Sequence, residues 1–551
     1  MGITTKQLVA LGSSQIAALS TLQVVALTTG QAAAFTTSNT AALTTTQLQA
    51  LETTDFAAIS TSGVRALETT AVASLSVAHV VALTTAQAAG LSTANASALT
   101  TIQLVALETS DFASLSAANL QAMGSTQIAS LTADQIVALT TAQAAGLSTA
   151  NMAALTTAQV VAMEVADLAV VSTSSVQALS TIQVAALTTV QVAGLSVKQI
   201  VGLSTAQTAS LTADQIVGLT TAQAAGLSTA NMAALTTAQV VAMEVADLAV
   251  VSTTSVQALS TTQVAALTTV QVAGLSVKQI VGLSTAQTAS LTADQIVGLT
   301  TSQAAGLSTA NMAALTTAQV AAIEVADLAV VSTTNLRALS TTQVAAMTTV
   351  QVAGLTTTHM VGLSTSNISG LTTTQVAALV TADLVYVSTS NLQALGTSQV
   401  AALTNDQVIA LSTTQALGLS SSNMAALTTL QLVVMEMHSV YHHSMQYSKM
   451  LLTFHYYCDN AMSVFWWGAA SPHTLSKYSL HLTHYLHRIY HLRKAFLQHS
   501  LAAFGANHRL PLLHWPAQSH ISHVAHVLVM LHQISPSRTV ACQHRVALQS
   551  N

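Results

Sequence analysis

The chain repeats every eight residues, and this period constrains its fold more than any other feature. An apolar residue, usually leucine, occupies every eighth position from Ile3 to Met435, so residues 3–434 form 54 octads without an insertion or deletion. Globular domains vary in loop length and do not keep such a period. A fixed period is typical of solenoids, in which each repeat contacts only its neighbours. We therefore expect stacked repeats rather than one large core.

Most octads follow the pattern Leu-(Ser/Thr)-Thr-x-Gln-(Val/Ile)-x-Ala, as in residues 187–194. In one straight α-helix each leucine would drift about 80° from the last, so every octad must contain a break. Thr188 and Gln191 have the spacing of a capping box, and Leu187 and Val192 that of a hydrophobic staple. The octads that begin at Leu139 and Leu403 share the pattern.

The pattern predicts an all-α solenoid with one short capped helix in each octad. A helix this short is unstable alone, so its Leu, Val/Ile and Ala positions must be buried against neighbouring repeats, with Thr and the variable positions outside. The alternative is a β-solenoid, because eight is an even number and Thr and Val favour strands. Abundant alanine and the regular capping residues favour the helical interpretation.

Composition excludes several classes of function. Only 6% of residues are charged and the net charge is −5, so no basic field is present for nucleic acid. Such low charge gives little electrostatic protection against self-association. No stretch of the array approaches the roughly 18–20 apolar residues of a transmembrane helix. The N-terminus enters the repeat at once, and no secretory signal peptide is visible.

Longer repeats are nested in the octads of residues 1–436. Residues 132–211, 212–291 and 292–371 are near copies, which indicates tandem duplication. Lysines and aspartates at equivalent variable positions of these copies are expected to be solvated surface charges: Lys198, Lys278, Asp134, Asp214 and Asp294. His79 and His359 replace the usual Gln and are interpreted as polar substitutions rather than ligands.

Some octads carry two carboxylates three residues apart, which is the spacing of one helix face. One hypothesis is a cation site repeated along the array, with Glu164, Asp167, Glu244, Asp247, Glu324 and Asp327 as the candidates in the near copies; the pairs Glu52 with Asp55 and Glu108 with Asp111 belong to the same class. We favour a second interpretation, in which acids near a helix N-terminus interact with the macrodipole. Two carboxylates fall short of the roughly six to eight oxygens that calcium prefers.

No catalytic constellation or cofactor site can be assembled from the array. It has two histidines, His79 and His359, among dozens of interchangeable Ser and Thr residues. We therefore expect no enzyme activity and no cofactor.

Residues 437–551 differ from the array in composition. All four prolines, all three tryptophans, both cysteines and 17 of the 19 histidines lie there. A genuine histidine-rich, metal-binding tail is one interpretation, although the spacings match no zinc template. We favour an out-of-frame translation of further repeats: a shifted frame converts His codons to Ser, Pro, Thr or Ala and Tyr codons to Leu, Ile or Val. These are residues of the octad.

The octad, as in residues 395–403, resembles the octapeptide-repeat regions of very large bacterial exoproteins, often labelled haem-utilisation or adhesion proteins. The resemblance covers about four fifths of the chain and implies a secreted or surface-displayed rod. No haem ligand or export signal can be assigned to a residue. We expect a non-catalytic structural protein, an adhesin-like stalk at the cell surface or outside the cell. The alternative is an interaction scaffold that binds protein or glycan through the outward Thr and variable face.

Overall fold

The structure is a computed structural model that describes residues 2–435. These residues form helices α1 (Thr5–Val9) to α53 (Ser421–Ala426), each four to six residues long and each beginning eight residues after the one before, and residues 429–435 are also helical. No strand occurs in this region. The prediction of one short helix per octad is confirmed, and the β-solenoid alternative is wrong. None of the described helices has the length and hydropathy of a membrane-spanning segment.

The break between helices comes from two successive extended residues. Leu187 closes α23 (Thr181–Ala186) with φ −55° and ψ 141°, and Thr188 precedes α24 (Thr189–Gly194) with φ −71° and ψ 157°. Neither residue needs the left-handed conformation that favours glycine. The chain therefore changes direction in every octad without a glycine or proline signal.

The predicted capping box holds each new helix in place. The Thr188 N–H donates to Gln191 Oε1 over 2.9 Å, and the Gln191 N–H donates to Thr188 Oγ1 over 3.2 Å. Gly12 has no side chain, yet its N–H still donates to Gln15 Oε1 over 2.9 Å. The same reciprocal bonds occur at Thr140 with Gln143 and at Thr404 with Gln407.

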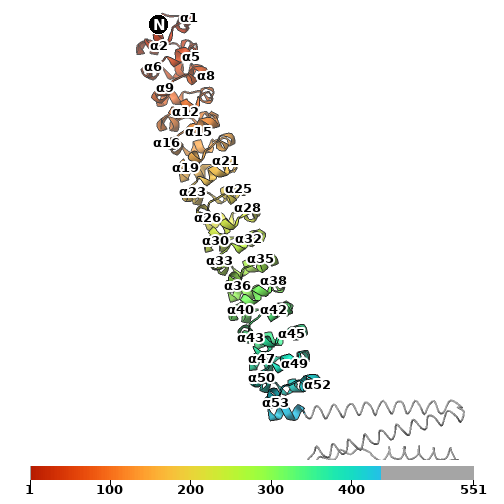
Figure 1. Ribbon diagram of the computed structural model, residues 1–551. Coiled ribbons are helices and arrows are strands. Elements are labelled where there is room, and N and C mark those ends of the chain that lie inside the picture. Colours follow the sequence, from red (N-terminus) through yellow and green to blue (C-terminus); the bar gives the residue numbers. More distant parts are fainter. Residues whose placement is uncertain (1, 436–551) are drawn as a thin grey trace, which may run out of the picture. The chain divides into compact units, whose positions relative to one another are not determined.

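The helices stack so that each one contacts the helix three places further along. Their order in the chain is also their order along the repeat region (Figure 1). The Leu and Val/Ile positions of successive octads, such as Leu187 (5% exposed) and Val192 (0%), form one continuous apolar core. Each buried aliphatic side chain contributes roughly 1.5–3 kcal/mol relative to exposure, which offsets the weakness of such short helices.

Consecutive turns of the solenoid pack closely at the small eighth position of the octad. A Cβ added at Gly194 would lie 2.1 Å from Val165 Cγ1, and one at Gly226 would lie 2.5 Å from Val197 Cγ1. In both pairs the glycine lies 29 residues after the valine, which is between three and four octads. One full turn of the solenoid therefore takes about that many residues.

Candidate functional site

The most regular polar feature of the interior is the row of side chains at the third helical position of the octads, here called the N3 row, which is polar and buried in most octads. Gln191 is 3% exposed, and its Nε2 donates to Val160 O (2.9 Å), Val161 O (3.1 Å) and Met163 O (2.8 Å). These carbonyls belong to α20 (Thr157–Ala162) and its C-cap, in the turn before. The Gln191 side chain therefore has two roles. Its Oε1 caps its own helix, and its Nε2 joins that helix to the previous turn of the solenoid.

Other polar residues in the N3 row make the same bond between turns. Asn119 Nδ2 donates to Leu91 O over 3.1 Å, and Ser175 Oγ donates to Leu147 O over 2.9 Å. His79 Nε2 lies 2.8 Å from Leu51 O. In each case the acceptor is the carbonyl 28 residues earlier.

The two array histidines belong to this row. His359 Nε2 lies 2.9 Å from Val331 O, and its Nδ1 accepts from the Thr356 N–H over 3.2 Å. His359 therefore uses one ring nitrogen for its own helix and the other for the previous turn, as Gln does. This placement agrees with the prediction of a polar substitution.

The first three octads show the N3 row without the bond between turns. Gln7, Gln15 and Gln23 are exposed, and their Oε1 atoms accept the N–H of their own caps over 2.8–2.9 Å. From Gln31 onward the amide reaches back: its Nε2 donates to Ile3 O over 2.8 Å. The cap and the bond between turns are thus separable functions of one side chain.

The acidic octads place their two carboxylates in different surroundings. Glu164 is the exposed N-cap of α21 (Val165–Val170) and makes no capping bond, whereas Asp167 stands in the N3 row and is 2% exposed. The same arrangement recurs for Glu244 with Asp247 and for Glu324 with Asp327. The predicted shared face therefore separates into a solvent-facing acid and a buried one.

Threonine hydroxyls of the previous turn partner several of the N3-row acids. Thr29 Oγ1 donates to Asp55 Oδ1, and Thr357 Oγ1 donates to Asp383 Oδ1, each over 2.8 Å and each across 26 residues. Asp167 differs, because its Oδ2 is buried without a hydrogen-bond partner. Such an atom carries a desolvation cost that no protein group offsets.

Burial raises the pKa of Asp167, and the nearby Glu164 raises it further. Burial is also the largest cause of the raised pKa of Asp247 and Asp327. At these two positions the hydroxyls of Thr221 and Thr301 act in the opposite direction, while Glu244 and Glu324 add to the rise. The raised pKa of all three aspartates follows from placing one negative charge in the interior and another close by.

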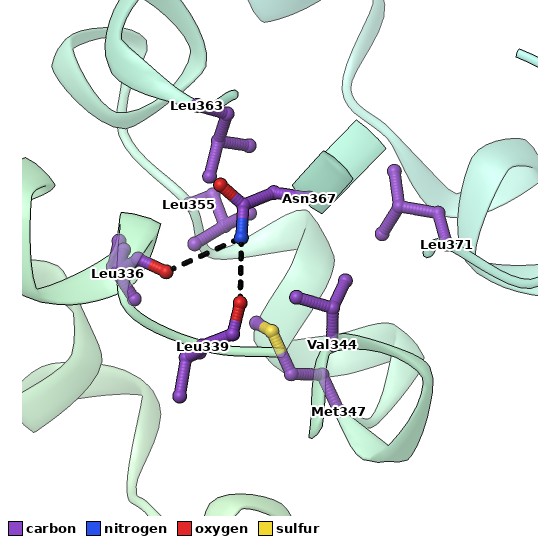
Figure 2. Close-up of a pocket in the computed structure, with 8 residues that line it drawn as sticks. All are labelled: Leu336, Leu339, Val344, Met347, Leu355, Leu363, Asn367 and Leu371. Atoms are coloured by element: carbon purple, nitrogen blue, oxygen red, sulfur yellow. Dashed lines mark hydrogen bonds between the residues drawn. The ribbon is translucent and has the colours of Figure 1, made fainter. Parts of the chain in front are cut away.

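The cavity drawn in Figure 2 belongs to the apolar core. Its volume is about 10 Å³, room for no more than a single water-sized sphere. Asn367 of the N3 row lies beside it and donates to Leu339 O over 3.0 Å and to Leu336 O over 3.5 Å. The remaining lining is apolar, so this cavity is a packing gap with no group for chemistry.

The outer surface carries threonines, small residues and scattered charges. Lys198, Lys278, Asp134, Asp214 and Asp294 are all exposed, as predicted. Large apolar residues are exposed at the second helical position of some octads, including Leu22 (81%), Ile102 (69%) and Ile182 (71%). Residues 437–551, with the histidine-rich tail and out-of-frame interpretations, lie outside the described region.

Seven segments of the chain match the model of the ALTTAQ repeat: residues 2–37, 48–85, 104–141, 160–197, 240–277, 320–357 and 376–413. These matches support a repeat region. They do not extend to the haem-utilisation or adhesion label. No curated protein and no solved structure matches the chain.

The positions of six of the seven ALTTAQ matches coincide with those of the N3-row aspartates. Each of the last six begins seven residues before an aspartate of the N3 row: Asp55, Asp111, Asp167, Asp247, Asp327 and Asp383. The N3-row acid is therefore a regular component of the segments that resemble this repeat.

Proposed function

We propose that this protein is a structural rod displayed outside the cell or at its surface, an adhesin-like stalk without catalytic activity. The observation that carries the proposal is the N3 row. In most octads the N3-row side chain that caps the helix also joins it to the previous turn, so the same octad can be added repeatedly. The near copies at residues 132–211, 212–291 and 292–371 are what lengthening by duplication would produce.

The rod proposal predicts that length follows repeat number. A chain without residues 212–291 should retain its helical circular dichroism per residue and show a smaller maximum dimension in small-angle scattering. The reason is that removing a whole number of octads leaves each Gln opposite a carbonyl of the preceding turn. An unchanged maximum dimension would contradict the proposal.

Location needs a separate measurement. Antibody raised against residues 132–371 is expected to label intact cells of the source organism as strongly as permeabilised cells. Labelling only after permeabilisation would contradict surface display and favour the scaffold alternative.

The scaffold alternative has one observation in its favour. Leu22, Ile102 and Ile182 are more than two thirds exposed and lie ten octads apart, and the next two equivalent positions are Thr262 and Thr342. Singly exposed apolar side chains are common on protein surfaces, so the support for this alternative comes from their equal spacing alone. In this alternative the outward Thr and variable face binds protein or glycan.

A further inference from the structure

The space between successive turns at the N3 row is lined by carbonyl oxygens and filled by an N–H group. Gln159 Nε2 lies 2.9 Å from Ile128 O, 3.3 Å from Ala129 O and 2.7 Å from Leu131 O. Asn151, one methylene shorter, still reaches Met123 O over 3.4 Å. A positive group therefore meets this set of acceptors in the octads that carry an amide.

The side chain of Asp167 has no N–H group that could donate to these carbonyls. The register of Gln159, whose acceptors Leu131 O and Ile128 O lie 28 and 31 residues earlier, assigns the carbonyls of Leu139 and Ile136 to Asp167. Its side chain is 2% exposed and its Oδ2 has no partner. Oxygen acceptors that face one another without a donor are unfavourable unless a positive species lies between them.

No side chain of the packed helices supplies that charge. α21 packs on α18 (Thr141–Ala145) and α24, and neither helix contains a titratable residue. On α17 (Ala133–Val137), which leads to the Leu139 carbonyl, the one ionisable residue is the exposed Asp134, also an acid. The Thr141 hydroxyl stands at the 26-residue spacing of Thr29 with Asp55, yet Asp167 Oδ2 has no partner, so a positive species would come from solution.

A second carboxylate distinguishes a metal cation from a proton. Of the six aspartates in the N3 row, five have a glutamate three residues earlier: Glu52, Glu108, Glu164, Glu244 and Glu324. Glu164 makes no capping bond, so helix capping does not account for it. One proton would leave the pair charged, whereas a divalent cation balances both carboxylates.

We propose that Asp167, together with Glu164 and the carbonyls of Ile136 and Leu139, binds a hard divalent cation of the calcium class. The duplicated blocks place the same two acids at Glu244 with Asp247 and at Glu324 with Asp327, where the hydroxyls of Thr221 and Thr301 bond the buried carboxyl. Carboxylate and carbonyl oxygens are the ligands that calcium prefers, and water completes the shell on the exposed Glu164 side. With so few protein ligands, affinity is expected in the range of about 0.1–1 mM.

The test uses the full chain and a matched pair of triple variants. In the first, Asp167, Asp247 and Asp327 are replaced by asparagine, a residue native to this row; in the second, the exposed Asp134, Asp214 and Asp294 are replaced by asparagine. At pH 7.5, 5 mM calcium chloride should raise the melting temperature of the parent and of the second variant by about 2 °C or more over choline chloride of equal ionic strength. The first variant should show no calcium-specific shift.

Two results would overturn the proposal. One is a parent chain whose melting temperature responds equally to calcium and choline. The other is an equal calcium response in both triple variants. A melting temperature that rises on acidification but not with calcium is one form of the first result, and it would show that the buried carboxyl binds a proton instead of a metal cation. If the first variant loses its helical circular dichroism, the variant with Glu164→Gln, Glu244→Gln and Glu324→Gln replaces it, with the calcium shift again expected to fall.

Discussion

Replacing Gln191 with leucine is expected to lower the local stability of the array by about 2–4 kcal/mol. The substitution removes the donor to Val160 O and Met163 O. Val160 O keeps the Met163 N–H, and a buried acceptor left unpaired, here Met163 O, costs about 1–3 kcal/mol. The capping bond to Thr188 is lost as well. The measurement is hydrogen exchange of the amides in α20 and α24, because a long array does not unfold in two states.

Two controls separate the bond between turns from the cap. Gln191→Asn keeps a donor of the kind that Asn119 uses, so its loss should stay below about 1 kcal/mol. Gln23→Leu removes the cap bond at Ser20 in the first turn, where the amide is exposed, and should cost about 1 kcal/mol. Equal losses at Gln191 and Gln23 would show that the bonds between turns contribute nothing.

Deleting a single residue is expected to damage the array far more than deleting a whole octad. Without Ala193, the amides of the next three octads shift by one residue relative to their acceptor carbonyls; these are Gln199, Gln207 and Gln215. The shift is avoided only if the C-terminal end of α24 unwinds. Either outcome should cost about 3 kcal/mol or more. Thermal unfolding followed by circular dichroism measures the loss.

Deleting residues 188–195 is the matched control, because it preserves the octad register. Every remaining amide still finds a carbonyl in the turn before, and Gly202 then takes the place of Gly194 opposite Val165. The melting temperature should change by no more than about 2 °C. A whole-octad deletion as harmful as the single one would show that stability does not depend on the period.

The helices and caps could be predicted from the sequence because they depend on residues close together in the chain. Thr188 and Gln191 are three residues apart, and the extended Leu187 and Thr188 end one helix and begin the next. The two capping bonds need no knowledge of the turn before. Local chemistry alone therefore gave one helix per octad.

The second bond of Gln191 could not be predicted in this way, because its acceptor depends on the pitch of the solenoid. For the same reason the spacing predicts that Asp167 shares one helix face with Glu164, whereas the structure exposes Glu164 and buries Asp167 between turns. The sequence does contain one signal of the pitch. Six octads have valine at the first helical position, and in five of them a glycine follows at the spacing that separates Val165 from Gly194. Only a small residue opposite a branched one fits that contact without displacement.

A disulfide between Val277 and Gly306, each replaced by cysteine in a chain with Cys458→Ser and Cys542→Ser, tests the stacking of turns most directly. A Cβ at Gly306 lies 3.9 Å from Val277 Cβ, within the roughly 3.5–4.5 Å that a disulfide requires. The pair should oxidise to an intramolecular disulfide, identified by peptide mapping without reduction, while Val277→Cys with Gly298→Cys, one octad nearer in the chain, should stay reduced. A reduced Val277–Gly306 pair, or equal oxidation of both pairs, would contradict a solenoid whose successive turns meet at this spacing.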